Sequence, residues 1–242
     1  MPEVSILMPV YNNHQFLARA LEAIKCQYNV DYELLVINDG STEPEIEKTL
    51  SSYENYTPRM KVLCSEDNNG YTLCLNWLLR NSVGEYIAFQ DADDNCVPRR
   101  LEKQLKAIKE RKLDMLSTYG TTINEKGKRI ANFYTDEAQR KPEKEILANL
   151  KNECWILGPS MMFARRVFDT IGYFDEELYF AQDYNYWLRA IDHGFKWGIL
   201  REELYNYRRH KGSVRHQHPE LKHIDWSEKA RERAAKFGII MK

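Results

Sequence analysis

Ala88-Phe89-Gln90-Asp91-Ala92-Asp93-Asp94 decides the fold and the site of this chain, because an apolar run that starts at Tyr86 ends there in three acids. A short apolar run is typical of a buried strand. Acids directly after it would lie at the edge of a sheet where open α/β sheets bind their ligands. Carboxylates this close repel one another, so the sequence predicts a positive partner: a divalent cation or a basic side chain.

The spacing of the three acids adds a geometric expectation. Residues two apart in an extended chain point the same way, so we expect Asp91 and Asp93 to reach one ion or ligand together. We expect Asp94 to point elsewhere and to cap the following helix. A solvated turn with a helix cap would explain this common tripeptide by itself, so the rest of the chain has to decide.

Strands and helices alternate ahead of the acidic stretch. This order is typical of βαβ units, so we expect an α/β fold whose mostly parallel central sheet is flanked by helices. The predicted strands are 4–10, 32–38, 60–65 and 86–89, and the predicted helices are 14–28, 45–53 and 71–81.

The pattern changes after Pro98, although no linker separates the two parts. A hairpin turn is expected at Asn124–Gly127. Charged residues at Arg140–Glu145 predict a mobile loop, and this loop and the segment after Lys211 are candidate lids. The remaining predictions are helices at 99–111, 145–152, 165–171 and 184–193, and strands at 115–122, 129–133, 160–164, 195–200 and 204–207.

Composition excludes several classes of protein. The 242 residues are 43% hydrophobic with a net charge of −1, which suits one larger domain and leaves no basic footprint for nucleic acid. Five cysteines without a CxxC favour free thiols in a reducing compartment. The start of the chain does not resemble a signal peptide, and no run approaches the roughly 20 apolar residues of a membrane span. We therefore expect a cytoplasmic protein.

Polar residues follow each of the first four strands. Tyr11 could stack on a planar ring, Asp39 could accept hydrogen bonds from a base or a ribose, and Gly70 would let the backbone approach a ligand. Because these strand ends meet at one edge of the sheet, they outline a nucleotide pocket with Asp91 and Asp93 at its phosphate end.

The first strand lacks the usual phosphate-binding loops. A dinucleotide fold normally has GxGxxG at this point, whereas this chain has Pro9-Val10-Tyr11-Asn12-Asn13, and no Walker lysine loop occurs. A diphosphate would therefore need a metal held by the acids.

These motifs, taken in order, resemble the family 2 inverting glycosyltransferases, which have the Rossmann-like GT-A fold. The resemblance extends from Val4 to about Ser213. The segments that carry it are Pro9–Asn12, Asn38–Ser41, Asn69–Gly70, Asp91–Asp94, Gly172–Glu176, Gln182–Asp183 and Tyr207–His210.

The resemblance implies a role for each site residue. Asp183 would be the catalytic base, and Asp93 and His210 would hold Mn²⁺ or Mg²⁺, with the imidazole favouring Mn²⁺. The implied nucleotide-binding residues are Pro9, Tyr11, Asn12, Asp39, Asn69, Gly70, Asp91 and Ala92.

The chain departs from the family pattern at two positions. Asn38 stands where the family often has an acid, but Asp39 remains, so we expect base binding to survive. Gln182 replaces the acid before Asp183, which bears on the pKa of Asp183 and on how the acceptor is positioned.

By resemblance, the chain is an inverting glycosyltransferase that moves a sugar from a nucleotide-diphosphate sugar, by default a UDP-sugar, to a hydroxyl of a glycan or lipid-linked acceptor in cell-surface polysaccharide synthesis. The fold would include a smaller acceptor-side lobe, and the single domain would divide into a nucleotide-binding half (1–97), an acceptor-binding half (98–213) and a C-terminal helical tail (214–242). A non-catalytic nucleotide-sugar binding module and a sugar nucleotidyltransferase are the alternatives, although a nucleotidyltransferase would need a glycine-rich basic loop after the first strand.

The tail leaves several interpretations open. Its basic and aromatic residues would suit a peripheral contact with the inner face of an anionic membrane. Packing on the body of the protein, or a dimer contact, is the simpler interpretation.

Overall fold

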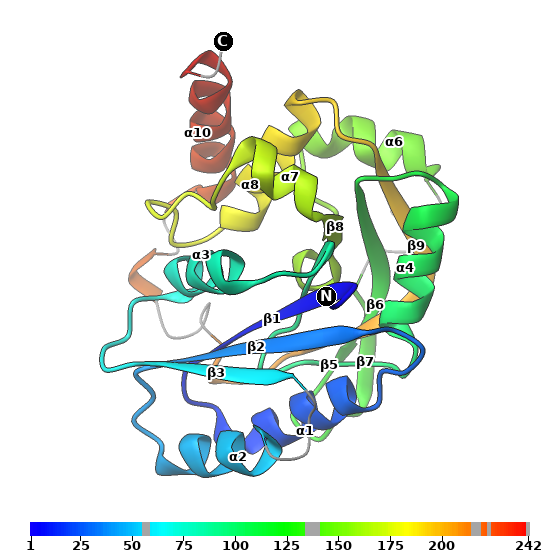
Figure 1. The fold of residues 1–242 in the computed structure, drawn as a ribbon. Helices are drawn as coiled ribbons and strands as arrows, with labels where there is room; N and C mark the ends of the chain where they lie inside the picture. Colours follow the sequence, from blue (N-terminus) through cyan, green and yellow to red (C-terminus); the bar gives the residue numbers. More distant parts are fainter. Residues whose placement is uncertain (55–58, 134–140, 214–218, 222–223, 241–242) are drawn as a thin grey trace.

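The computed structural model covers residues 1–242 and describes all of them except 55–58, 134–140, 214–218, 222–223 and 241–242. One sheet runs through the described chain in the strand order β3-β2-β1-β4-β8-β6-β9-β5, with β7 paired to β6. The sheet is curled, and helices lie around it (Figure 1). The α/β fold expected from the sequence is confirmed.

The amino-terminal part of the sheet is parallel. It consists of β1 (Val4–Val10), β2 (Tyr32–Asp39), β3 (Met60–Ser65) and β4 (Tyr86–Phe89). All seven residues of β1 are buried, which explains its unbroken apolar sequence, because a central parallel strand is covered on both faces. These four strands match the prediction, with β2 one residue longer.

Helices cover both faces of this parallel part. The helices α1 (His14–Lys25) and α2 (Pro44–Glu54) lie on one face, and α3 (Tyr71–Asn81) lies on the other (Figure 1). The apolar stripe of α1 is buried, as its helical spacing requires.

The second half continues the same sheet. The strand β8 (Met162–Ala164) pairs antiparallel with β4 and so joins the two halves. The other strands are β5 (Asn95–Cys96), β6 (Met115–Ile123), β7 (Arg129–Asn132) and β9 (Trp197–Arg208). The helices are α4 (Arg100–Glu110), α6 (Glu143–Ala148), α7 (Arg165–Ile171), α8 (Gln182–Asp192) and α10 (Trp226–Ile240), with 3₁₀ turns η1 (Asn149–Lys151), η2 (Gly158–Ser160) and η3 (Pro219–Leu221).

The prediction of two late strands is wrong, because β9 is one strand of 12 residues. The charged residues Arg201, Glu202 and Glu203 interrupt the apolar pattern in the sequence, yet the strand continues through them. Register shifts against β6 near Tyr119 accommodate them while their side chains stay exposed. The short strand β5, which pairs with β9, left no signal in the sequence.

The charged stretch before α6 is more ordered than expected. Residue 140 lies outside the described residues, but α6 begins at Glu143, two residues earlier than predicted. The Glu143 carboxylate accepts hydrogen bonds from Arg111 at 2.6 and 2.8 Å and from the backbone N–H of Ile199 at 2.8 Å. The prediction of a mobile loop is therefore wrong from Glu143 onward. The other candidate lid falls partly on 214–218, outside the described residues.

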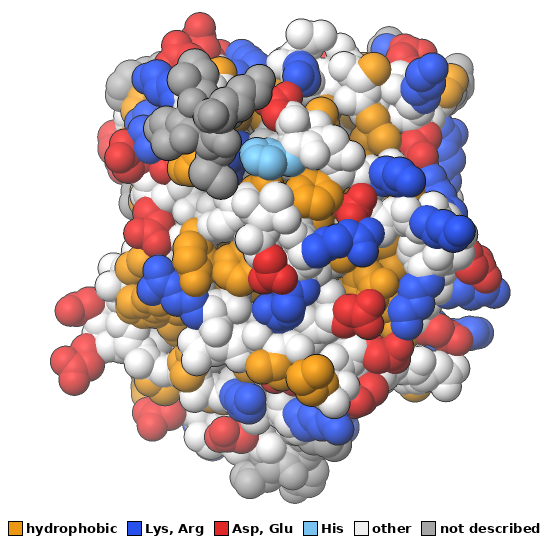
Figure 2. Space-filling model, turned by 45° about the horizontal axis from the view of Figure 1, so that its top comes forward, with side chains coloured by type: hydrophobic (Ala, Val, Ile, Leu, Met, Phe, Trp, Pro, Cys, Tyr) orange, Lys and Arg blue, Asp and Glu red, His pale blue; other side chains and the backbone are white. Residues whose placement is uncertain are grey.

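The tail helix α10 packs on α8 (Figure 1). Ala230 and Ala234 are buried against the body, and the Asn185 side chain donates a hydrogen bond to the Ala230 carbonyl at 3.1 Å. Among the described residues, none of the helices combines the length and the apolar character that crossing a bilayer demands. On the face in Figure 2, basic and acidic side chains are interspersed, with small hydrophobic groups between them.

Candidate active site

A cavity of about 800 Å³ opens at the edge where β1, β2 and β4 end. It brings together residues from both halves of the chain, including Asp39, Asp93 and Asp183, as the sequence predicts. Of the predicted site residues, Pro9, Tyr11, Asn12, Asp39, Asn69, Gly70, Asp91, Ala92, Asp93 and Asp183 all line it. His210 does not line the cavity, but its ring contacts Asp93, which does.

The cavity wall is acidic. Among the described residues that line it there are five acids and no lysine or arginine; the acids are Asp39, Asp91, Asp93, Glu176 and Asp183. An anionic ligand such as a diphosphate would therefore meet repulsion here unless a cation accompanied it.

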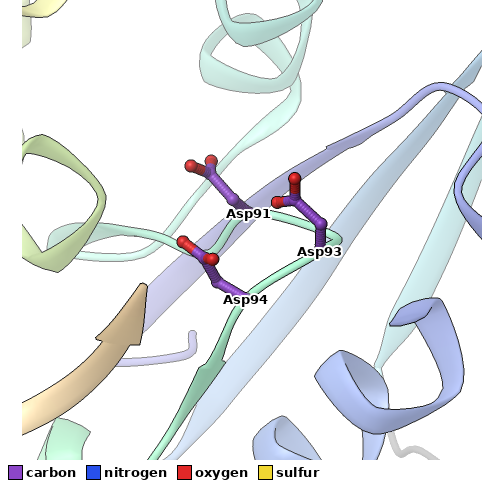
Figure 3. A group of neighbouring side chains, drawn as sticks. All are labelled: Asp91, Asp93 and Asp94. Atoms are coloured by element: carbon purple, nitrogen blue, oxygen red, sulfur yellow. The ribbon is translucent and has the colours of Figure 1, made fainter. Parts of the chain in front are cut away.

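The acidic loop after β4 folds as a turn rather than an extended chain, because the Asp94 N–H donates to the Asp91 carbonyl at 3.3 Å. Even so, ligand oxygens of Asp91, Asp93 and Asp94 lie within 4.8 Å of one another. In Figure 3 the three side chains extend from this loop toward the same side.

Asp94 is a correction to the sequence analysis. It does not cap the next helix, whose N-cap is Arg99. Instead it is 1% exposed, and its Oδ1 accepts the Arg208 N–H at 2.6 Å. Its Oδ2 is buried without a hydrogen-bond partner among the described residues. Burial and the nearby acids raise the pKa of Asp94 well above its usual value.

Asp91 is held by two tyrosines that the sequence analysis did not single out. The Tyr71 hydroxyl donates to Asp91 Oδ1 at 2.7 Å, and the Asp91 N–H donates to the Tyr205 hydroxyl at 3.1 Å. Burial, followed by the charge of Asp93, raises the pKa of Asp91 to about 7. Nothing in sequence spacing links Tyr71 or Tyr205 to this loop, since tertiary packing brings them there.

His210 contacts the acidic loop as its predicted role requires. Its side chain is fully buried, and Nε2 lies 2.8 Å from Asp93 Oδ2. The edge of its ring packs on Phe16, with 4.6 Å between ring centroids. A cation shared by these two residues would replace their direct hydrogen bond.

The donor set fits a hard divalent cation. Asp91, Asp93 and Asp94 supply oxygen ligands, and the buried Asp94 Oδ2 has no other described partner. Added positive charge would also relieve the repulsion that raises the pKa of Asp91.

At the end of β2, the carboxylate of Asp39 already has hydrogen-bond partners. Its oxygens accept hydrogen bonds from the backbone N–H groups of Asn69 and Gly70, both at 2.9 Å. Asp39 therefore fixes the loop before α3, and a nucleotide contact would use its remaining lone pairs. Gly70 has a φ of +91°, a left-handed conformation that favours glycine.

Tyr11 and Asn12 lie beside this loop. The Asn12 Oδ1 accepts the Thr42 N–H at 2.9 Å, and the Asn12 N–H donates to Ser41 Oγ at 2.9 Å, so Asn12 ties the ends of β1 and β2 together. The Tyr11 ring is 38% exposed at the cavity, where a planar group could stack on it.

Asp183 lies in the first turn of α8 and lines the cavity. It is not the helix cap, because the N-cap is Ala181 with a φ of +58°. Gly158 packs against it, and a Cβ at position 158 would lie only 2.2 Å from Asp183 Oδ2. Nothing in the spacing of the sequence links Gly158 to Asp183, so this contact could not be foreseen.

The neighbouring Gln182 also lines the cavity, and its Oε1 is buried without a hydrogen-bond partner among the described residues. The Gln182 amide occupies the position at which the family pattern has an acid, directly before Asp183, the predicted base.

Arg100 connects the two sides of the site. It is fully buried and donates to the Phe89 carbonyl at 3.0 Å and to the Pro159 carbonyl at 3.2 Å. The first contact lies just before the acidic loop, and the second lies next to Gly158 behind Asp183. Its position in a highly charged, amphipathic helix did not indicate that this arginine would be buried.

Comparison with known proteins identifies chains that are similar to this one. A family model described as "Glycosyl transferase family 2" matches residues 5–172. An uncharacterized glycosyltransferase of Methanocaldococcus jannaschii is 32% identical over 213 residues, covering 86% of this chain and 71% of that protein. The O-antigen biosynthesis glycosyltransferase WbnJ of Escherichia coli is 29% identical over 217 residues, covering 87% of this chain and 81% of that protein.

Among solved structures, S. aureus TarS in complex with UDP-GlcNAc superposes with a TM-score of 0.72 at 22% identity. The match covers 87% of this chain and 60% of the TarS chain. At this identity the likeness establishes the fold.

Proposed function

Since this chain belongs to glycosyl transferase family 2, we propose that it transfers a sugar, with inversion, from a nucleoside-diphosphate sugar to a hydroxyl of a second molecule. The observation that carries this proposal is the acidic cavity, where Asp91 and Asp93 line a cleft shared with Asp183 and no described lining residue is basic. A diphosphate needs a cation in such a site, and an alcohol needs a base.

The donor proposed is a UDP-sugar, and the acceptor proposed is a glycan or lipid-linked hydroxyl in polysaccharide synthesis. TarS, which shares the fold, has been crystallised with UDP-GlcNAc, and the E. coli relative is named for O-antigen biosynthesis. In this chain the Tyr11 ring would stack on the base, while Asp39, Asn69 and Gly70 would hold the nucleoside.

Each residue has a defined task in the proposed reaction. Asp183 accepts the proton of the acceptor hydroxyl as its oxygen bonds to the anomeric carbon. The bond from that carbon to the phosphate oxygen breaks, and its electron pair leaves with the diphosphate. Mn²⁺ or Mg²⁺, held by Asp93 and Asp91 with His210 nearby, would offset the charge of the leaving diphosphate.

A non-catalytic binding module remains the competing proposal, because Gln182 stands where the family pattern has an acid. Such a module would bind a nucleotide-sugar without consuming it.

We also propose that the chain acts as a single domain with the divisions 1–97, 98–213 and 214–242, in the cytoplasm. The five cysteines are all free, which suits a reducing compartment.

The test is release of UDP from a panel of UDP-sugars by the purified chain with Mn²⁺, with Mg²⁺ and with EDTA. We expect slow metal-dependent hydrolysis of one donor without any acceptor, and no release in EDTA. Metal-dependent donor binding without any release would instead support the binding module.

A further inference from the structure

Three aromatic rings pack together beside the cavity and form what we call the aromatic wall: Tyr179, Phe180 and Trp226. Ring centroids lie 5.0 Å apart for Tyr179 and Phe180, 5.7 Å for Phe180 and Trp226, and 6.5 Å for Tyr179 and Trp226. Tyr179 and Phe180 line the cavity, and Tyr179 is 44% exposed. Burial of apolar area is favourable, and much of the Tyr179 ring is not buried by the protein itself. The ring therefore offers a ligand an apolar surface to pack on.

Carboxylates stand on both sides of the aromatic wall in the sequence. Asp183 follows Phe180 by three residues, and Glu176 precedes Tyr179 by three; both acids line the cavity. The side chain of Glu176 is held by Asn76, which is fully buried and donates to Glu176 Oε1 at 2.8 Å. Ring faces beside hydroxyl-accepting carboxylates match a sugar ring, which has an apolar C–H face and polar hydroxyl edges.

The tail helix braces this part of the cavity from behind. Glu176 faces Asn76 and the cavity, whereas its neighbours Asp175 and Glu177 both pair with Arg233 of α10. Trp226, at the start of the same helix, packs on Phe180. The residues of this brace lie beyond 172, where the match to the family model ends, so the aromatic wall belongs to the part of the chain that the shared model does not cover.

We propose that the aromatic wall and Glu176 form a subsite for a sugar ring of the acceptor, which presents its hydroxyl to Asp183. The proposal rests on the proposed function and specifies its acceptor as a pyranoside rather than a simple lipid alcohol. A phosphate-bearing headgroup fits poorly, because Glu176 and Asp183 are acidic and no described lining residue is basic.

The test uses saturation-transfer NMR on the full chain with UDP and Mg²⁺, which is diamagnetic and leaves the ligand signals sharp. The probes are methyl glycosides of glucose, galactose, N-acetylglucosamine, mannose and rhamnose, with 1-octanol as the lipid alcohol. We expect saturation transfer to at least one glycoside and none to octanol. The affinity for that glycoside should fall roughly threefold to tenfold in Tyr179→Ala and in Phe180→Ala.

Tyr28→Ala is the matched control, because Tyr28 is an exposed tyrosine, 50% accessible, that does not line the cavity. Its glycoside affinity should equal that of the unmodified chain. Glu176→Gln keeps the shape of the side chain and should weaken glycoside binding, while titration with UDP should give the same affinity in Phe180→Ala, in Glu176→Gln and in the Tyr28→Ala control.

The outcomes separate this inference from the proposed function. Unchanged glycoside affinity in both aromatic variants, or binding of octanol but of no glycoside, would overturn the subsite while metal-dependent UDP release left the proposed function standing. Failure of the unmodified chain to bind UDP or to release it would overturn both.

Discussion

Gly158 and Asp183 show how much one residue can depend on the absence of another residue's side chain. The Asp183 carboxylate occupies the volume that a Cβ at position 158 would fill, at 2.2 Å from Oδ2. The chain therefore positions its proposed base by leaving out a methyl group, and this contact can be tested directly.

For Gly158→Ala we expect the added methyl group to displace the Asp183 carboxylate. Turnover should fall on the order of 10²-fold, as expected for a misplacement of about 1 Å in a catalytic group. UDP affinity, measured by titration calorimetry, should stay unchanged because neither Gly158 nor Asp183 is among the proposed nucleotide-binding residues. Equal turnover at an unchanged melting temperature would show that the carboxylate tolerates the shift.

Asp183→Asn tests the base itself. The amide is isosteric and cannot accept the proton, so acceptor-dependent turnover should fall roughly 10²- to 10⁴-fold. Donor binding should persist. Asp169→Asn, an exposed acid on α7, is the control; a variant at 183 with the turnover of that control would place the base elsewhere.

Asp93→Ala tests the proposed cation site at the same scale. It removes one oxygen ligand and the partner of His210, so stimulation of UDP release by Mn²⁺ should disappear. The measurement is UDP release against Mn²⁺ concentration, with Asp169→Ala as the control. Full stimulation in the Asp93 variant would remove Asp93 from the site.

Sequence reasoning identified the residues that lie at strand ends but not those that hold them in place. Asp91, Asp93 and Asp183 could be named because strand exits meet at one edge and because their pattern resembles a family. Tyr71, Gly158 and Arg100 could not, since each acts through a contact between segments far apart in the chain. Asp94 was misassigned, because a turn replaced the extended chain on which the prediction depended.

At the scale of elements, continuous apolar strands were predictable, whereas the very short strand β5 and the irregular strand β9 were not. The boundaries of β1 and β4 match the prediction because burial on both faces forces their apolar runs. The partly exposed edge strand β3 and the amphipathic helix α3 match as well. The long strand β9 was split in two by its exposed charges, which its register shifts against β6 tolerate.

The helix α10 gives a prediction that belongs to this scale. Arg233→Ala removes the ion pairs with Asp175 and Glu177 and so frees the segment that carries Glu176. Glycoside affinity should fall, while UDP affinity should not change. The glycoside affinity of Arg233→Lys should lie between those of Arg233→Ala and the unmodified chain, because an ammonium keeps the charge but cannot form the two parallel hydrogen bonds of a guanidinium. Equal loss of UDP and glycoside binding would indicate general unfolding, which a thermal melt would reveal.

At the scale of the whole molecule, the acidic cavity should make stabilisation by UDP depend on a divalent cation. A ligand present at 100 times its Kd stabilises the native state by about 2.7 kcal/mol. For a domain of this size that corresponds to a rise in Tm of roughly 5–10 °C. With UDP and Mn²⁺ we expect such a rise in a thermal-shift assay, and in EDTA we expect UDP to give almost none. A rise of the same size in EDTA would show that positive side chains, rather than a cation, meet the diphosphate.

The guanidinium of Arg100 has a consequence for which acceptors the site can use. One rigid, planar group grips the strand that leads into the acidic loop and the backbone beside Gly158, so the span between the two sides is set when the chain folds. The leaving diphosphate beside the acidic loop and the attacking alcohol beside Asp183 would then bind at a fixed separation. Little reorganisation of the protein would be needed during sugar transfer. The enzyme would then select acceptors by length as well as by shape, because a hydroxyl carried on too short or too long an arm would miss the anomeric carbon.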